Sequence, residues 1–425
     1  MHASVYSQFF LFGLVVTSLL KFWLAMRQRH HVLAHRATVP PAFVERITLE
    51  AHQKAADYSR DKTLIAQIEL LVDASFLLAI TLGGGLNAAD VWLRSMLGNG
   101  MLQGLALFAC FGLVSGILDL PFALYRTFVI EERYGFNKTT WRLWLADSLK
   151  GMALGATIGG PLLAAVLWVM DAMGDWWWLY SWLVWLGFNL LMLWLYPTVI
   201  APLFNKFSPL KNESLMERIN ALLTRCGFTS SGLFVMDGSR RSAHGNAYFT
   251  GFGKAKRIVF FDTLLVSLSP LEIEAVLAHE LGHFHHRHVL KRFVVLALVA
   301  LALLWGASFV MSDSGFFTGL GVDQPGTAMA LLLFSVVLPV VMFPLTPLVA
   351  ALSRRDEFQA DAYAARQASA NDLATALVKM YQENAATLTP DPLHSLFYDS
   401  HPAANDRIQR LLGNINVPDL TSAHA

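Results

Sequence analysis

The stretch SPLEIEAVLAHELGHFHHRHVLKR, residues 269–292, ends where a long apolar run begins. Ser269 followed three residues later by Glu272 is typical of a capping box, and Pro270 suits the first position of a helix. We therefore expect a helix over residues 270–289, with AHELGH well inside it.

His279 and His283 share one face of this expected helix. They are four residues apart, so their imidazoles lie one turn above the other and can reach a single ion. Glu280 can accept a proton from a water that the ion activates, which is the chemistry of H-E-x-x-H. His288 comes nine residues after His279, so an unbroken helix turns it away from the ion. A polar, partly exposed helix end near a membrane surface is expected for His285, His286 and His288, and the alternative for each is support of a ligand residue or proton handling.

A complementary acidic pair lies downstream, in SRRDEFQADAYA, residues 353–364. Glu357 and Asp361 are also four residues apart on one helical face. Zinc in hydrolases commonly takes two His and one Glu, so Glu357 would complete the ligand set. Asp361 could accept the other ring N–H of a ligand histidine and fix its tautomer. The alternatives are a chance H-E-x-x-H match in a surface helix and a carboxylate that pairs with Arg354 or Arg355.

The composition indicates a membrane protein. Of 425 residues, 55% are hydrophobic and 15% are charged, and a net charge of +1 offers no field to attract nucleic acid. The only cysteines, Cys110 and Cys226, are too few for a disulfide framework. Seven apolar segments can cross a hydrocarbon core about 30 Å thick. They lie near 5–26, 65–86, 101–125, 151–171, 176–200, 291–311 and 327–352.

The short connections predict how the chain is oriented. Basic residues gather between segments one and two and between segments three and four, whereas the alternate connections contain only Arg94. The positive-inside rule then places the N-terminus outside and the C-terminus in the cytosol. His279 and His283 precede segments six and seven and Glu357 follows them, so both motifs reach the same cytosolic face. A bacterial inner membrane is the expected location, with the endoplasmic reticulum membrane as the alternative.

The chain divides accordingly into membrane and cytosolic parts. Residues 1–200 are expected to contain five membrane segments, with cytosolic loops at 27–64 and 126–150. Residues 201–290 form the first part of a protease domain. Residues 291–352 contain segments six and seven, and residues 353–425 form the second part of that domain. Within the first cytosolic part we expect an amphipathic helix over 213–226, a strand over 232–236, and a hairpin from 246–252 and 257–262.

Two features of the apolar segments predict contacts inside the membrane. Gly151, Gly155 and Gly159 form a doubled small-xxx-small pattern, which predicts close approach of a neighbouring helix. Asp73 and Asp119 lie deep in apolar segments, and each is expected to face an aqueous cavity or to hydrogen-bond an adjacent helix.

The sequence resembles the type I CAAX prenyl endopeptidases, seven-helix membrane zinc metalloproteases of the gluzincin kind. The stretches that carry the resemblance are FVIEERYGFNKTT (128–140), YPTVIAPLFNKFSPL (196–210), NAYFTGFGKAKRIVFFDTLL (246–265), LAHELGHFHHRH (277–288), SRRDEFQADAYA (353–364) and SHPAANDRIQRL (400–411). The resemblance implies a mainly α fold, in which seven helices enclose a water-filled chamber capped by an α+β protease domain with a small β-sheet.

The resemblance also implies roles for further residues. One zinc per chain would be bound by His279, His283 and Glu357. An edge strand at Asn246 and Ala247 would hold the substrate backbone by strand addition. His401 and Arg407 match family positions that face the zinc and help to stabilise the oxyanion.

We therefore expect an integral membrane zinc metalloendopeptidase that acts on peptides or on segments of membrane-associated proteins. The compact length resembles that of bacterial relatives, so a prenylated substrate is not implied. Membrane lipids surround the protein, nucleic acid is not a partner, and the oligomeric state is not indicated. One alternative is a site-2-type intramembrane protease, which would carry H-E-x-x-H inside a span. Another is a proteolytically silent scaffold or transporter with a structural zinc.

Overall fold

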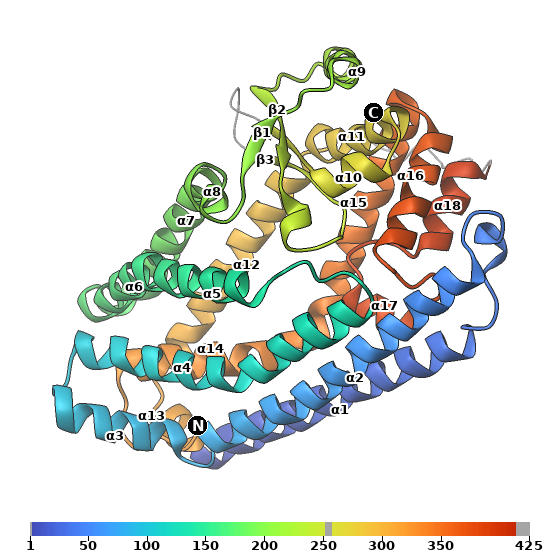
Figure 1. Ribbon diagram of the computed structural model, residues 1–425. Coiled ribbons are helices and arrows are strands. Elements are labelled where there is room, and N and C mark those ends of the chain that lie inside the picture. Colours follow the sequence, from blue (N-terminus) through green and yellow to red (C-terminus); the bar gives the residue numbers. More distant parts are fainter. Residues whose placement is uncertain (1, 251–256, 414–425) are drawn as a thin grey trace, which may run out of the picture.

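The computed structural model describes residues 2–250 and 257–413. Within them, seven helical spans are long and apolar enough to cross a membrane, which confirms the predicted number. The spans consist of α1 (Ala3–Ala34), α2 (Leu49–Ile80), α4 (Met101–Tyr125), α5 (Trp141–Leu154) with α6 (Gly160–Ala172), α7 (Trp177–Leu195) with α8 (Ala201–Phe204), α12 (His288–Val310), and α14 (Thr327–Met342) with α15 (Thr346–Gln367). Two short helices, α3 (Gly85–Leu97) and α13 (Ser314–Gly319), lie together near the N-terminus (Figure 1).

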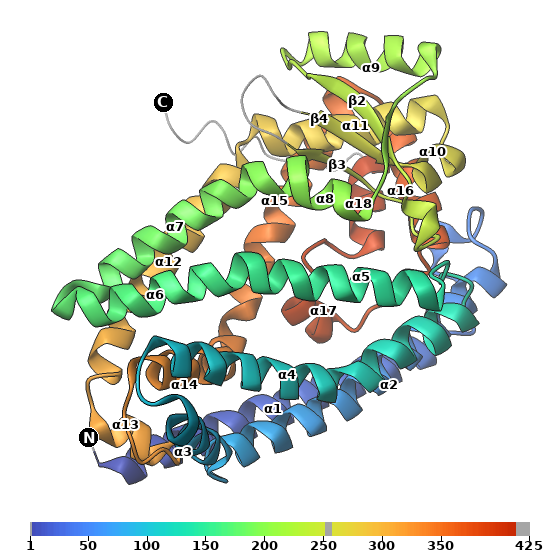
Figure 2. The ribbon, with the colours of Figure 1, turned by 60° about the vertical axis from the view of Figure 1, so that its left-hand side comes forward.

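The membrane helices stand around a central space and do not pack into a solid bundle (Figure 2). In the most apolar window of each span, between 0% and 33% of the residues are buried. Such low burial leaves the helices exposed on an inner as well as an outer face, as a chamber requires. A cavity of about 520 Å³ opens between α1, α2, α15 and α17 (Pro392–Tyr398), and Asp73 and Lys21 line it. Asp119 is exposed.

Close helix packing occurs at a glycine that the sequence pattern did not single out. A Cβ atom at Gly151, Gly155 or Gly159 would meet nothing within 4 Å, so the predicted approach of a helix to this pattern is wrong. A Cβ atom at Gly104 of α4 would instead lie 2.7 Å from the Cβ of Ala328 in α14. The small-residue spacing of α5 and α6 thus faces open space, because these helices belong to the wall of a ring.

A four-stranded sheet lies beyond one end of the ring. Its strands are β1 (Phe207–Pro209), β2 (Gly232–Met236), β4 (Arg257–Phe261) and β3 (Ala247–Thr250), in that spatial order. β2 coincides with the strand expected over 232–236. β3 and β4 pair antiparallel, as the expected hairpin requires, and the residues that connect them lie outside the described part of the chain. β3 is therefore an edge strand.

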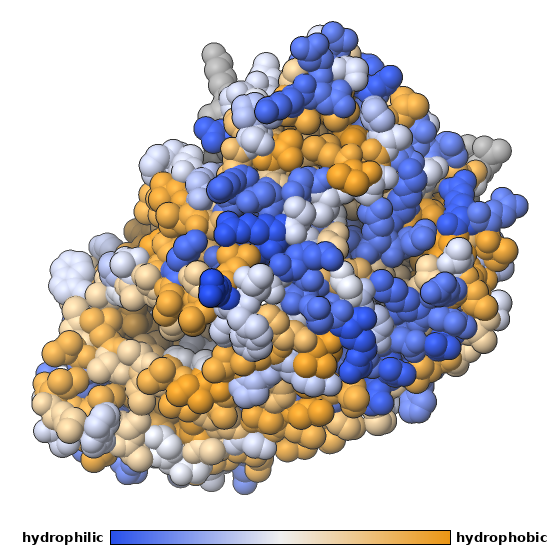
Figure 3. Space-filling view, viewed as in Figure 1, coloured by the Kyte–Doolittle hydropathy of each residue, from blue (hydrophilic) through white to orange (hydrophobic). Residues whose placement is uncertain are grey.

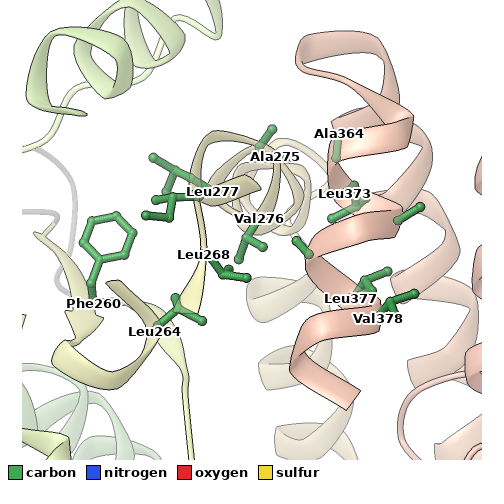
Figure 4. Packing of buried hydrophobic residues seen from close by; sticks show 14 of the residues in the cluster. Phe260, Leu264, Leu268, Ala275, Val276, Leu277, Ala364, Leu373, Leu377 and Val378 are labelled. Carbon is green, nitrogen blue, oxygen red and sulfur yellow. The ribbon is translucent and has the colours of Figure 1, made fainter. Parts of the chain in front are cut away.

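One apolar core joins the sheet to the helices beside it (Figure 4). These helices are α9 (Glu213–Arg225), α10 (Asp262–Ser267), α11 (Pro270–His285), α15, α16 (Ala370–Glu383) and α18 (Ala404–Leu412). Phe260 and Leu264 contribute from the sheet side, and Leu373 from α16. Phe43, in the connection between α1 and α2, is fully buried in the same core. The connection between α1 and α2, which lies within the predicted cytosolic segment 27–64, thus fastens the first two membrane helices to this unit.

The surface separates into two regions that match the two parts of the fold. Apolar residues dominate the surface of the membrane helices in the lower part of Figure 3, and polar residues gather over the unit that carries α9, α16 and α18. Large apolar side chains such as Phe9, Leu19 and Leu113 are more than half exposed on these helices. Lipid chains would cover such side chains in a membrane.

Candidate active site

A capping box sets where α11 begins. The Ser269 hydroxyl accepts a hydrogen bond from the backbone N–H of Glu272 at 3.4 Å, and the Glu272 carboxylate accepts one from the backbone N–H of Ser269 at 2.7 Å. Lys379 of α16 donates a further hydrogen bond to Glu272 at 2.8 Å. Burial alone would raise the pKa of Glu272, but these donors hold it below its usual value. The cap fixes the register of the helix, and with it the face on which the histidines lie.

His279, His283 and Glu357 come together between α11 and α15. The Nε2 atoms of the two histidines are 3.2 Å apart, and the Glu357 carboxylate oxygens lie 3.5 Å from His279 and 3.4 Å from His283. Ligand atoms held at about 2.0–2.2 Å from a tetrahedral zinc ion are about 3.3–3.6 Å from one another. Each imidazole is therefore about as far from the other, and from the nearer Glu357 oxygen, as two ligands of one zinc ion are from each other.

The chemistry of these donors fits a cation as well as their spacing does. Glu357 Oε2 is buried and has no hydrogen-bond partner within the described residues, although buried polar atoms are normally paired. Burial alone would lower the pKa of His279, yet Asp361 and Glu357 beside it raise that pKa to about 9. The same negative charge also favours a bound metal ion, which would displace the proton from His279.

A buried network stands behind His279. Its Nδ1 lies 2.8 Å from Asp361 Oδ1, so the ring can donate to Asp361 while Nε2 faces Glu357. Arg407 of α18 donates to the same carboxylate through Nε at 2.9 Å and through a second nitrogen at 2.6 Å. Its remaining nitrogen lies 3.9 Å from Glu357. Asp361 and Arg407 are each at most 5% exposed, so both charges depend on this pairing.

A break in the chain brings His288 behind His283. The helix expected over 270–289 ends at His285, because Arg287 adopts a left-handed conformation (φ 55°) and α12 starts in a new direction at His288. His288 is consequently 1% exposed, and its Nδ1 lies 3.0 Å from the Nδ1 of His283. The prediction of an exposed His288 that points away was wrong, because it assumed an unbroken helix.

The other two histidines of the stretch do not join the cluster. His285 is exposed with its ring centroid 4.7 Å from that of Tyr363, and His286 is partly exposed. Burial and the neighbouring cations lower the pKa of His286 to about 4. The spacing of residues in the sequence does not distinguish His288 from His285 and His286. The position of the helix break distinguishes them, and the sequence contains no clear signal that a break occurs at Arg287.

Glu280 and His401 border the cluster. Glu280 follows His279 on α11 and is partly exposed, and burial raises the pKa of its carboxylate. His401 precedes α18, and its Nε2 lies 3.5 Å from Glu357 Oε2. The His401 side chain is 62% exposed, so it stands on the solvent side of the cluster. The structure thus places an acid–base group and an imidazole at the open side of the three donors.

The edge strand β3 lies beside α11. The Phe249 ring of β3 is 5.0 Å from the Phe284 ring of α11, one residue beyond His283. Asn246 accepts a hydrogen bond from the backbone N–H of Phe261 at 2.9 Å, so its backbone groups face β4. In an antiparallel ladder the next residue, Ala247, then turns its backbone groups toward the open edge, where its N–H donates to the Asn246 side-chain oxygen at 2.8 Å.

Comparisons with known proteins agree with this arrangement. Residues 28–206 match the family described as CAAX prenyl protease N-terminal, five membrane helices, and residues 209–415 match peptidase family M48. A CAAX prenyl protease 1 homolog of Arabidopsis thaliana is 36% identical over 90% of this chain and 92% of its own length. The CAAX prenyl protease 1 homolog of Homo sapiens is 32% identical over 92% of this chain and 91% of its own length.

A solved structure shares the whole architecture. The crystal structure of S. mikatae Ste24p superposes with a TM-score of 0.90 at 29% sequence identity, and the match covers 96% of this chain and 99% of that one. Fold and site together define a multi-pass membrane metalloendopeptidase. The chain belongs to peptidase family M48, among the relatives of CAAX prenyl protease 1.

Proposed function

We propose that His279, His283 and Glu357 bind one zinc ion and that the chain hydrolyses peptide bonds at this site. The observation that carries the proposal is the closeness of the three donor groups: the two Nε2 atoms are 3.2 Å apart, His279 Nε2 is 3.5 Å from Glu357 Oε2, and His283 Nε2 is 3.4 Å from Glu357 Oε1. When bound, zinc polarises a peptide carbonyl and lowers the pKa of a water molecule. Glu280 accepts the proton of the attacking water and later delivers it to the leaving amine. Burial raises the pKa of the Glu280 carboxyl above its ordinary value, which makes the carboxylate a stronger proton acceptor.

The residues around the ligands keep them in position. Asp361 accepts from Nδ1 of His279, which leaves Nε2 free for the metal, and Arg407 holds Asp361 through two hydrogen bonds. We assign Arg407 this positioning role in addition to the expected effect on the oxyanion. His401, on the solvent side, donates to the negative charge that develops on the carbonyl oxygen.

The substrate in this proposal is an extended peptide segment that adds to the open edge of β3. Asn246 and Ala247 lie at that edge, and main-chain hydrogen bonds to Ala247 need no particular side chain. The curated relatives are named for CAAX prenyl proteins, whereas backbone recognition requires no lipid on the substrate. We infer that unmodified peptides and segments of membrane-associated proteins are cleaved. In either a bacterial inner membrane or the endoplasmic reticulum, the distribution of basic loops supports a site on the cytosolic side.

The test is zinc content and hydrolysis of an unmodified peptide by detergent-purified protein. We expect about one zinc per chain, retained without turnover in Glu280→Gln and lost in Glu357→Ala. A Glu383→Gln variant, changed at the far end of α16, serves as the matched control and should keep both. Zinc and activity retained in Glu357→Ala would refute the ligand set. Normal turnover of Glu280→Gln would refute the general base.

A further inference from the structure

A cavity of about 450 Å³ lies under the face of the sheet that turns away from α11. Phe234, Tyr248 and Val259 line it from the sheet, and Pro197 and Pro202 line it from the end of the fifth membrane span. Figure 2 shows α8, the last turn of that span, beside the sheet. The cavity is thus bounded by the edge strand on one side and by the point where the chain leaves the membrane on the other.

The register of the sheet ties this cavity to the edge strand. Phe234 of β2 pairs with Val259 of β4, and Val259 pairs with Tyr248 of β3. Residues that are directly paired across strands point to the same face, so these three side chains form a row that ends at the open edge. The residue of an added strand that pairs with Tyr248 would continue the row, with its side chain over the cavity.

The neighbouring residues of such a strand would face the opposite way. Ala247 and Phe249 pack on the core side of the sheet, next to Phe284 of α11. Side chains alternate along a strand, so substrate residues that pair with Ala247 and Phe249 would point to the side of the metal ligands. The cavity can therefore be filled from only one face of the bound segment.

The rim of the cavity is positively charged. Lys206 and Arg257 line it, both are exposed, and neither forms an ion pair within the described residues. No carboxylate is among the lining residues. The Arg257 guanidinium lies 5.4 Å from the centroid of the Phe234 ring, so a cation stands directly above the apolar floor.

We propose that this cavity is a specificity subsite, which takes a large apolar side chain of the substrate residue that pairs with Tyr248 and favours an acidic residue close to it on the same face. Aromatic and proline side chains provide the apolar floor, and the two cations attract the acidic neighbour. This inference rests on the proposed binding of substrate along β3, and it adds the side-chain class to the backbone recognition described there.

The first test is a scan in which one Phe moves along an otherwise Ala- and Ser-rich unmodified peptide, with cleavage positions read by mass spectrometry. One apolar group in a matching pocket is worth about 10- to 200-fold in kcat/KM. We expect that gain at one position and not at either immediate neighbour. In Pro202→Trp, where the larger ring fills the cavity, the ratio of kcat/KM between the Phe peptide and the Ala peptide should fall toward one. Equal gains at adjacent positions, or an undiminished gain in Pro202→Trp, would overturn the subsite.

The second test uses charge. A peptide with Asp two residues from the preferred Phe should have a higher kcat/KM than the peptide with Lys at the same position. In the double variant Lys206→Glu/Arg257→Glu, the Lys peptide should instead have the higher kcat/KM. Lys211→Glu, an exposed lysine outside the cavity, is the matched control and should leave the order unchanged. If the double variant still prefers the Asp peptide over the Lys peptide, the two cations have no part in the specificity of the subsite. Cleavage of no peptide at all would contradict the proposed function, whereas cleavage of all peptides equally would contradict only this subsite.

Discussion

The Nδ1 atom of His288 lies 3.0 Å from the Nδ1 atom of His283, although an unbroken helix would point His288 away from the metal ligands. Its Nε2 lies 2.9 Å from Gln359 Oε1, which can only accept. His288 therefore carries its proton on Nε2 and offers Nδ1 as an acceptor. His283 must then donate from Nδ1, which leaves its Nε2 lone pair for a metal.

Removing this acceptor should weaken the metal site. We expect His288→Ala to lower zinc affinity about 10- to 100-fold, the usual cost of losing a hydrogen-bond partner of a ligand histidine. His288→Asn, whose side chain can still accept, should recover part of the loss. The measurement is zinc competition with a chromogenic chelator, and His285→Ala is the control because His285 is exposed. Equal affinities of the His288→Ala and His285→Ala proteins would show that His283 needs no support from His288.

Arg407 should matter for stability as well as for the site. Arg407→Met leaves the buried Asp361 carboxylate with only His279 as a partner, and breaking a buried ion pair costs about 3–5 kcal/mol. Thermal unfolding in detergent measures this loss. Arg410→Met, on the same helix but exposed, should cost about 1 kcal/mol or less. Adding Asp361→Asn should restore part of the stability. No recovery in the double variant would mean that the unpaired charge is not the cause.

The charged Glu272 side chain should contribute to the stability of the folded protein, and this contribution should depend on pH. Its pKa is held below the usual value in the folded protein, so the unfolded chain takes up a proton at a higher pH than the folded chain does. The contribution is complete above the unfolded pKa of about 4.3 and disappears as the pH falls through the folded pKa. We expect Glu272→Gln to be about 1 kcal/mol less stable at pH 7.

That difference between wild type and Glu272→Gln should shrink as the pH is lowered from 5 toward 4 and below. Thermal unfolding of both proteins across this range, without added zinc, measures it. Glu217→Gln, an exposed change on α9, should show no such trend. If the difference in stability between the two proteins stays constant with pH, the substitution acts through something other than the charge of Glu272.

Gly104 and Gly116 offer a matched pair on α4. Alanine at Gly104 would place its Cβ 2.7 Å from the Cβ of Ala328, which forces α4 and α14 apart and should cost about 1–3 kcal/mol. Alanine at Gly116 meets nothing within 4 Å, so Gly116→Ala should be neutral or slightly stabilising. Apparent melting temperatures in detergent compare the two. Similar values would argue against close contact between α4 and α14.

The orientation can be tested with single cysteines in a background of Cys110→Ala and Cys226→Ala. Lys211→Cys, beside the sheet, should react with an impermeant maleimide only when the cytosolic side is accessible. Asn99→Cys, between α3 and α4, should react only from the opposite side. Both positions are exposed, so access to reagent depends on the membrane alone. Labelling of both from one side would contradict the proposed topology.

Much of the fold and site could be predicted because it depends on local periodicity. His279 with His283, and Glu357 with Asp361, are each separated by four residues, and that spacing alone places each pair on one helix face. The apolar lengths predicted the seven spans, and the cap at Ser269 predicted where α11 begins.

What the sequence could not provide depends on contacts between distant segments. The helix break at Arg287 is visible only in its left-handed backbone, and it is this break that buries His288. The glycines of α5 and α6 fit a packing pattern, but whether a neighbour exists depends on the curvature of the whole ring. Phe43 and Ile47 enter a core whose other buried members lie more than 150 residues away in the chain.

The seventh span has a consequence for how the enzyme is made. α14 and α15 belong to one span and are joined by the 3-10 turn Phe343–Leu345, and Glu357 lies on the part of α15 that reaches α11. A nascent chain whose last two membrane helices have not yet been inserted carries the two histidines without the carboxylate. With Glu357 as the third ligand, such a chain would acquire hydrolytic capacity only once its final hairpin is in the bilayer.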